Sequence, residues 1–313
     1  MGKRRNNNKR DINGWFILDK PIGMTSTQAL GKLKFLLKPK KAGHAGTLDP
    51  QASGLLPLAF GEATKTVPFV MDGRKVYRFT VRWGEQTTTD DVEGDIIETS
   101  DVRPDAQEIE KLLPEFTGEI MQVPPQFSAI KVNGERAYDI ARDGEKVALE
   151  ARPISVHRLT LTDRPDQDTA VFEAECGKGT YVRSLARDMA IMLGTRGHVV
   201  ALRRLLVGPF GEEDMISLEK VEELANSAAE ELDFDLASLI RPIETVLDDI
   251  PALAVNRVDA ARLRNGQAVI LRGRDAPVFE GTVSVTSAGG LVALAEFQQG
   301  ALHPKRVFNL NSD

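Results

Sequence analysis

The sequence has 313 residues but only one cysteine, Cys176, and only four histidines. A lone cysteine excludes an internal disulfide, and so few thiol and imidazole groups argue against a dedicated zinc cage. No run approaches the roughly 18 consecutive apolar residues of a membrane-spanning helix, and the first residues lack the apolar stretch of a secretory signal. These absences predict a cytoplasmic protein that holds no metal and crosses no membrane.

The remaining composition is that of an ordinary globular protein. Hydrophobic residues make up 42% and charged residues 27% of the chain, which is long enough for more than one domain. We find no internal repeat at a fixed period, so solenoid and propeller folds are set aside.

Charge is distributed unevenly along the chain, although the net charge is only -6. Residues 1–41 hold eleven lysines or arginines against two aspartates, whereas residues 212–249 hold thirteen acids against two cations. A basic segment suits a polyanion such as RNA, but a solvated tail has the same composition. Charge alone leaves both readings open, and we predict that residues 1–10 form a disordered basic arm.

Hydrophobic periodicity predicts the main elements of the first 250 residues. A capping box formed by Thr25 and Gln28 opens a helix that ends before Pro39. Apolar or aromatic side chains alternate with polar ones over 76–83, which indicates a half-buried strand with Tyr77 on the same face as Trp83. Further strands are expected at 15–18 and 171–176, and an amphipathic helix at 182–193.

The rest of the chain gives coarser predictions. Residues 124–152 are rich in proline, glycine and charge and predict a long excursion from the core. The acidic stretch 212–249 is expected to form connecting helices. Beyond Pro251 the runs 268–271, 282–286 and 291–297 predict short strands of a small separate β-rich domain.

The densest chemical signal is the sequence GHAGTLDP at residues 43–50. Its glycines permit close backbone approach to a ligand, and Pro50 biases Asp49 away from helical geometry, so Asp49 is predicted to lie on a stiff loop. The loop lacks the Lys-Ser/Thr ending of a phosphate-binding Walker loop. An ordinary Asp-Pro turn would give the same pattern.

A second signal is GKGTYVR at residues 177–183. Thr180 is predicted to cap the following helix, which puts Arg183 in the first turn, where the helix dipole disfavours a cation. We therefore expect an anion next to Arg183, either Asp49 or a phosphate. A solvated surface arginine is the alternative.

Several blocks in the same order resemble the TruB family of pseudouridine synthases. They span about residues 11–208 and are DING at 11–14, DKP at 19–21, GHAGTLDP at 43–50, KVYR at 75–78, GTYVR at 179–183 and HVVALRRL at 198–205. The resemblance implies isomerisation of one uridine in the transfer RNA T loop, position 55 in standard tRNA numbering, to pseudouridine.

The resemblance also implies roles for individual residues. Asp49 matches the catalytic aspartate, Tyr77 the tyrosine that stacks on the target base and helps remove its C5 proton, and Arg183 the arginine that pairs with the catalytic carboxylate. Three further positions match residues that contact the flipped nucleotide or shape its pocket: His44, Tyr181 and Leu202. Two match a motif that supports the active-site loop: Lys20 and Pro21.

By resemblance, the fold is α/β (α+β), with a catalytic domain over 11–250 around a mixed, largely antiparallel sheet and a small PUA-like domain over 251–313. The similarity in that second domain is confined to Leu263, Asn265 and Gly266. Residues 124–152 resemble a thumb-like insertion that clamps the RNA loop, matching at Lys131, Gly134, Tyr138, Ala141 and Gly144. The implied partner is the tRNA T-stem loop. We expect a monomer with no obligate protein partner.

The reaction itself can be carried out with a single carboxylate. Uridine must break its N1–C1′ bond, rotate and form a C5–C1′ bond, and no water has to be activated. Attack on the sugar, addition to the base and abstraction of a sugar proton all remain open for Asp49, and none requires a metal or an organic cofactor. The stacked target base must also be flipped out, which takes a few kcal/mol from RNA binding.

Two other functions fit the same residues. One is a relative of the dyskerin-type enzymes, which share the Gly-Thr-Leu-Asp block and act on RNA chosen by a guide RNA and partner proteins. The other is a tRNA-folding chaperone whose value is binding. The apparent thumb insertion favours a stand-alone enzyme over the first, and the intact Asp49, Tyr77 and Arg183 argue against a catalytically dead protein.

Overall fold

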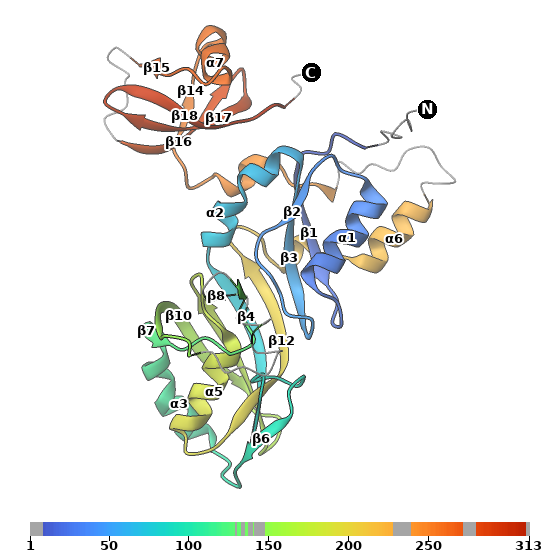
Figure 1. Ribbon diagram of the computed structural model, residues 1–313, viewed down its shortest axis with the longest axis vertical. Coiled ribbons are helices and arrows are strands. Elements are labelled where there is room, and N and C mark those ends of the chain that lie inside the picture. The colour runs from blue at the N-terminus through green and yellow to red at the C-terminus, as the bar shows by residue number, and fades with distance from the viewer. Residues whose placement is uncertain are drawn as a thin grey trace.

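The computed structural model describes residues 9–128, 130–132, 135–136, 140, 148–227, 239–271 and 280–310. These residues form a long central sheet with a second, smaller β-rich unit at one end, coloured orange to red (Figure 1). None of the helices in these ranges is both long and apolar enough to cross a membrane.

The central sheet is mixed and largely antiparallel, which confirms the predicted fold class. Its order is β13-β1-β3-β12-β4-β11-β10-β7, and β2 pairs with β3 outside this path. Only the β1–β13 and β3–β12 pairs are parallel among the pairs described. The strands are β1 (Gly14–Lys20), β2 (Ala42–His44), β3 (Ala52–Phe60), β4 (Lys75–Trp83), β7 (Gly118–Gln122), β10 (Arg152–Asp163), β11 (Thr169–Cys176), β12 (Gly197–Val207) and β13 (Ile216–Ser217).

Alternation on β4 is the pattern that the sequence predicted. Phe79, Val81 and Trp83 are buried in one hydrophobic cluster, and Tyr77 packs against the same cluster from its edge. Helix α5 (Val182–Met192) covers this face of the sheet and buries its apolar stripe there. The predicted strands at 15–18, 76–83 and 171–176 are thus confirmed as β1, β4 and β11.

Helix α1 (Ser26–Leu37) begins at the predicted capping box, where Thr25 and Gln28 bond to each other's backbone N–H. It ends at Lys38, whose backbone is left-handed with φ 50°, directly before Pro39. Helix α1 lies beside α6 (Leu218–Ser227), and Lys32 Nζ lies 3.4 Å from Glu222 Oε1 between them (Figure 1). The remaining short helices of the body are η1 (Gly61–Lys65), α2 (Val67–Asp72), α3 (Ala106–Leu112), η2 (Leu113–Phe116), η3 (Glu212–Asp214) and η5 (Ile243–Val246).

The expectation of connecting helices over 212–249 is only partly met. Helix α6 and two short 3-10 helices lie there, but β13 also pairs with β1 through Leu18 and Ile216. Residues 228–238 lie outside the described ranges.

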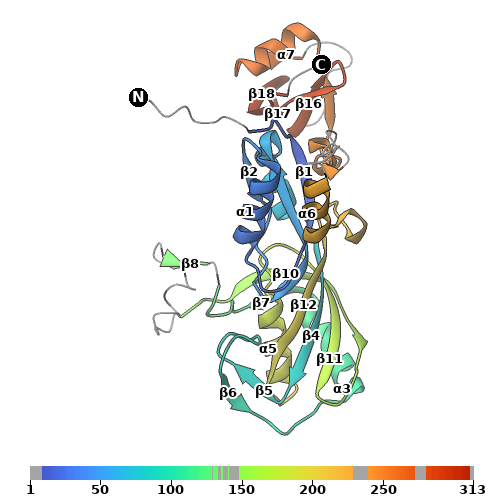
Figure 2. The same ribbon diagram turned by 90° about the vertical axis from the view of Figure 1, so that its right-hand side faces the viewer.

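Two hairpins leave the central sheet. One joins β5 (Glu85–Thr87) to β6 (Ile96–Thr99), and the other joins β8 (Lys131–Val132) to β9 (Glu135–Arg136). Figure 2 shows β8 standing to one side of the body. The predicted excursion starts on the core, because Pro124 and Pro125 are buried. Four of its family-matched positions lie outside the described residues: Gly134, Tyr138, Ala141 and Gly144.

The C-terminal unit is β-rich, as predicted, and has the sheet order β14-β16-β17-β18-β15. Its elements are β14 (Ala252–Ala254), α7 (Arg257–Arg264), β15 (Val269–Ile270), β16 (Gly281–Ser287), β17 (Gly290–Gln298) and β18 (Ala301–Val307). The sequence did not reveal β18, whose polar residues and Pro304 break the strand pattern, or α7, which is capped by Asn256.

This unit contacts the rest of the chain through apolar packing and through hydrogen bonds to two side chains of η1. Leu291, Leu294 and Phe308 belong to one buried cluster with Trp15 of β1. Lys65 Nζ donates to the carbonyl of Val307 at 2.6 Å, and the backbone N–H of Asn309 donates to Glu62 Oε2 at 2.7 Å.

Candidate active site

Asp49 lies on the loop between β2 and β3, at the centre of the sheet. The loop is fixed by a reciprocal pair of bonds: Leu48 N–H donates to Ser26 Oγ at 2.8 Å, and Ser26 Oγ donates to the carbonyl of Leu48 at 3.1 Å. Gly46 has φ +95°, a backbone geometry that favours glycine. The Asp49 side chain remains 41% exposed on this well-anchored loop.

Lys20 supports the loop from below and is fully buried at the end of β1. Its Nζ donates to the carbonyls of Pro21 at 2.8 Å and Met24 at 2.7 Å, and reaches that of Pro50 at 3.5 Å. Lys20 thus ties the end of β1 to the residue that follows Asp49. Burial lowers the pKa of its ammonium to about 8, although the nearby Asp49 carboxylate opposes this shift.

Arg204 of β12 is a second buried cation beneath the loop, and no sequence pattern predicted a role for it. Its side chain is 2% exposed, and Nε donates to the carbonyl of Leu55 at 2.8 Å. Nη1 and Nη2 reach the carbonyls of Thr47 and Gly46, both at 3.5 Å. No carboxylate lies within 4 Å of the guanidinium in the part of the chain that the structure describes, so Arg204 holds a backbone rather than an acid.

Arg183 lies over Asp49 from the first turn of α5. Nη2 is 3.0 Å from Asp49 Oδ2, which supplies the anion that the helix-dipole argument requires. Nη1 lies 3.5 Å from Asp91 Oδ2 and donates to the carbonyl of Thr89 at 3.0 Å, while Nη2 also donates to that of Phe127 at 3.0 Å. Four partners fix this buried guanidinium in one orientation.

Asp91 and its neighbour Asp90 were not singled out from the sequence. Asp90 has φ 59° and pairs with Arg187 of α5 at 3.0 Å, so both acids bind successive turns of the same helix. The signal for them was the TTTDDVEG run at 87–94, whose threonines and glycine predict a tight turn with two acids at its centre.

Tyr77 lies across the strand pair from Arg204, with Leu202 two residues away on β12. Tyr77 and Leu202 both pack against two hydrophobic clusters, one that includes residues of α5 and one that includes residues of α1. Burial raises the pKa of the Tyr77 hydroxyl above its ordinary value, and the neighbouring Arg204 opposes only part of that rise. The phenol is therefore neutral at pH 7.

Tyr181 is the N-cap residue of α5, so the prediction that Thr180 caps this helix is wrong. Among the described residues no side chain makes a cap hydrogen bond to this helix. Tyr181 is instead held by Gln122: Tyr181 N–H donates to Gln122 Oε1 at 2.9 Å, and Gln122 Nε2 donates to the carbonyl of Tyr181 at 3.1 Å. Sequence spacing could not show this, because Gln122 belongs to β7.

His44 lies at the end of β2, half-buried, and its Nδ1 is buried with no hydrogen-bond partner among the described residues. Burial lowers the pKa of the imidazole below its ordinary value, and Arg204 adds to this shift. The ring is therefore neutral at pH 7 and has a free nitrogen beside the loop that carries Asp49.

A small pocket opens beside the carboxylate of Asp49. It is lined by Asp49, Asp91, Arg183 and Leu202 with their neighbours, and its volume of about 20 Å³ holds roughly one water molecule. A nucleoside base enters only if the lining residues move apart. The described residues contain no group of three His, Cys, Asp or Glu side chains that could hold a metal ion.

The low pKa of Lys20 predicts a pH-dependent stability that Lys20→Met lacks. Its folded pKa is about 8 and its ordinary value 10.5, so the unfolded chain binds more protons between these pH values. The unfolding free energy of the wild type should therefore rise relative to Lys20→Met, by about 3 kcal/mol between pH 7 and 11. Urea denaturation at stepped pH measures this difference. The exposed Lys32→Met is the control, and the stability of the wild type should not rise relative to it over this pH range. A difference between the wild type and Lys20→Met that stays constant with pH would contradict the assignment.

Comparison with solved structures identifies the class of fold. An H/ACA RNP bound to a substrate RNA containing 2'-deoxyuridine aligns with TM-score 0.73 and 24% identity over 95% of this chain and 85% of that chain. A Cbf5-Nop10-Gar1 complex aligns with TM-score 0.71 and 25% identity over 97% of this chain and 92% of that chain. The fold is that of the pseudouridine synthases.

The family models and relatives are more specific. Residues 34–182 match the N-terminal domain of the TruB family pseudouridylate synthases, and residues 183–248 match the tRNA pseudouridylate synthase B C-terminal domain. The tRNA pseudouridine synthase B of Bradyrhizobium diazoefficiens is 65% identical over 99% of this chain and 89% of that protein. That of Agrobacterium fabrum is 55% identical over 96% of this chain and 95% of that protein. The chain belongs to the TruB family.

Proposed function

We propose that this chain is the tRNA pseudouridine-55 synthase that its family membership indicates, an isomerase that converts the T-loop uridine of tRNA to pseudouridine. The observation that carries the proposal is the Asp49–Arg183 pair of 3.0 Å at the mouth of a pocket in the centre of this fold. It supplies one oriented carboxylate, which is what the reaction needs.

The proposed reaction begins with RNA binding. RNA binding flips the target nucleotide toward the pocket beside Asp49, which Leu202 lines, and Tyr77 and Tyr181 supply aromatic surface that replaces its stacking. The carboxylate of Asp49 then faces the sugar and the base. The N1–C1′ bond breaks, the base turns while it is held, and C5 bonds to C1′. The C5 hydrogen leaves as a proton and N1 gains one, so no oxidant or reductant takes part.

The buried cations position Asp49 and the loop that carries it. Lys20 and Arg204 hold the backbone on both sides of Asp49, and Arg183 orients the carboxylate itself. His44, neutral and with a free nitrogen, is suited to accept or donate one hydrogen bond to the displaced nucleotide. Because burial keeps the Tyr77 phenol neutral, stacking is the role that the site supports best for it.

The proposal also includes the domain organisation of the chain and its state in the cell. We infer a catalytic domain over 11–250, a thumb-like insertion over 124–152 that clamps the T-stem loop, and a PUA-like module over 251–313. The protein is proposed to act as a cytoplasmic monomer without an obligate protein partner.

Tritium release from a T-stem-loop RNA that carries 5-tritiated uridine tests the function. Formation of the C5–C1′ bond expels the C5 hydrogen, so the purified chain alone should release the label of the one T-loop uridine to completion. An RNA with cytidine at that position is the control and should release none.

A guide-dependent enzyme is the second candidate, because the fold resembles Cbf5 in a complex with Nop10 and Gar1. Release by the purified chain, without guide RNA or other proteins, would contradict this second candidate. Tight binding without release would contradict the stand-alone function and leave a guide-dependent enzyme or a chaperone.

A further inference from the structure

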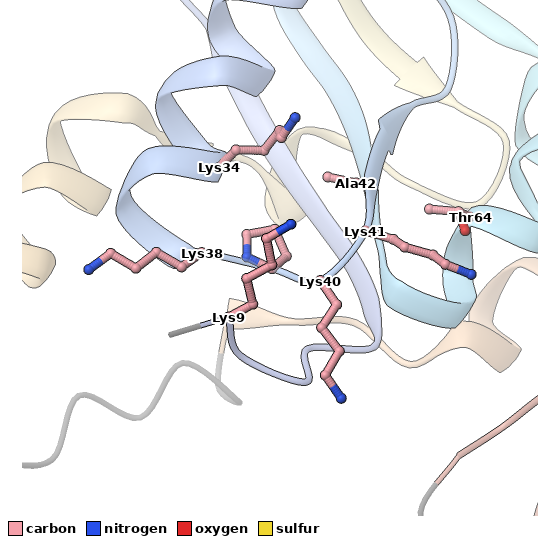
Figure 3. A pocket seen from close by; sticks show the side chains of 8 residues that line it. Lys9, Lys34, Lys38, Lys40, Lys41, Ala42 and Thr64 are labelled. Atoms are coloured by element: carbon pink, nitrogen blue, oxygen red, sulfur yellow. The ribbon is translucent and has the colours of Figure 1, made fainter. Parts of the chain in front are cut away.

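Five lysines surround one open depression that the proposed reaction does not use. This lysine cluster comprises Lys9, Lys34, Lys38, Lys40 and Lys41 (Figure 3). The depression has a volume of about 750 Å³, and its other lining residues are Pro39, Ala42 and Thr64.

The fold gathers these lysines from segments apart in the sequence. Lys34 and Lys38 come from the last turn and the C-cap of α1, and Lys40 and Lys41 lead into β2. The N-terminal segment is bonded alongside them: Arg10 N–H donates to the carbonyl of Lys38 at 2.8 Å, and Lys40 N–H donates to that of Arg10 at 3.1 Å. This pairing puts Lys9 at the depression, with the other side chains fanning out around it (Figure 3).

The positive charge of the cluster is mostly unneutralised. Lys40 Nζ lies 2.7 Å from Asp11 Oδ2, and across the described ranges no other lysine of the cluster has a carboxylate within 4 Å. The nearby Glu62 is already engaged by Lys65 at 2.5 Å and by the backbone of Asn309. Like charges held close together repel one another, so an anion in the depression lowers their energy.

The cluster lies at the far end of β3 from the active site. Ala42 pairs with Phe60 at one end of the strand, whereas Asp49 precedes Ala52 at the other. At about 3.3 Å per residue the strand separates the two places by roughly 25 Å. A nucleotide held at Asp49 therefore cannot reach the lysine cluster, but the RNA that extends from its loop can.

We propose that the lysine cluster binds backbone phosphates of the RNA stem that continues from the target loop, an inference that rests on the proposed function. None of the eight residues that line the depression is aromatic, so the depression offers no surface on which bases stack. The lining residues include no arginine, whose guanidinium binds phosphate through two parallel hydrogen bonds, and the flexible lysine ammonium groups suit single charge contacts to phosphates. Such contacts position a duplex without reading its sequence. An acidic protein is the less favoured occupant, because protein interfaces are depleted in lysine and enriched in arginine.

The test compares two variants of equal charge on two RNAs. Lys34→Gln/Lys41→Gln removes two charges from the cluster, and the matched control Lys32→Gln/Lys220→Gln removes two exposed charges that pair with Glu222 and Glu223. The RNAs carry the same T loop, one on a short stem and one on a stem lengthened by more than a helical turn. Tritium release gives kcat and KM, and binding at stepped salt gives the salt slope.

On the long stem, the cluster variant should raise KM about tenfold and reduce the slope of log K against log salt by about 2, with kcat unchanged. On the short stem it should behave like the wild type, and the control should do so on both RNAs. Equal loss on both RNAs would overturn the placement on the stem, and no loss on either would overturn RNA contact at the cluster. Both outcomes are read only if the wild type releases tritium. A wild type that releases none would mean that the proposed function has failed, which is a different result from a failure of the lysine cluster to bind RNA.

Discussion

Asp49→Asn should lower kcat on the T-stem loop by about 10⁴-fold or more, because the amide has neither the charge nor the basicity of the carboxylate. RNA affinity should stay within a few fold of the wild type. Arg183 keeps its contacts with Asp91 and with the carbonyls of Thr89 and Phe127, so the fold of the site does not depend on the Asp49 charge. Single-turnover tritium release and filter binding measure the two quantities.

The matched control for this substitution is Asp72→Asn, which removes an exposed carboxylate paired with Lys178 on the surface. It should leave both turnover and binding unchanged. Loss of RNA binding together with turnover in Asp49→Asn, or a lowered melting temperature, would show that Asp49 is structural and would contradict its catalytic role.

Arg183→Met should have the largest effect on stability, a loss of about 3 to 5 kcal/mol in unfolding free energy, as well as a loss of turnover. The guanidinium is buried, and its removal leaves the carboxylate of Asp91, itself 7% exposed, without its ion-pair partner. Asp49 also loses the group that orients it. Urea denaturation and tritium release follow the two effects separately.

A second substitution separates these effects. Adding Asp91→Asn to Arg183→Met removes the uncompensated charge and should recover part of the lost stability, because a buried amide costs less to desolvate than a carboxylate. Turnover should not recover, since Asp49 remains unoriented. Recovery of activity in the double variant would mean that Arg183 serves only to neutralise Asp91.

Local patterns were sufficient to predict the elements that carry most of the site. Alternation over 76–83 put Tyr77 on the core face of β4, and the capping box of Thr25 located the start of α1. The unfavourable place of Arg183 in a first helical turn indicated a nearby anion, and that anion is Asp49 in the structure. Each of these features depends on residues close in sequence, or on a charge that requires a partner.

The missed features depend on contacts between distant segments. Arg204 reads as one of two adjacent arginines on a strand, and only the pairing of β12 with β3 and β4 buries it beneath the loop. Helix α5 has Tyr181 and not Thr180 as its N-cap residue, and Gln122 at the end of β7 bonds to the backbone of Tyr181. Strand β13 has two residues and no pattern of its own, so its pairing with β1 was not predictable.

The apolar cluster shared by the two sheets has a consequence for the independence of the domains. Phe308 and Leu291 fill the same core as Trp15, and Glu62 and Lys65 close the boundary with hydrogen bonds. Removing the chain after Ile250 would therefore expose an apolar surface around Trp15 to solvent and leave the side chains of Glu62 and Lys65 without their backbone partners. We therefore expect the two units to unfold together, and a substrate bound across both would meet a fixed spacing between them.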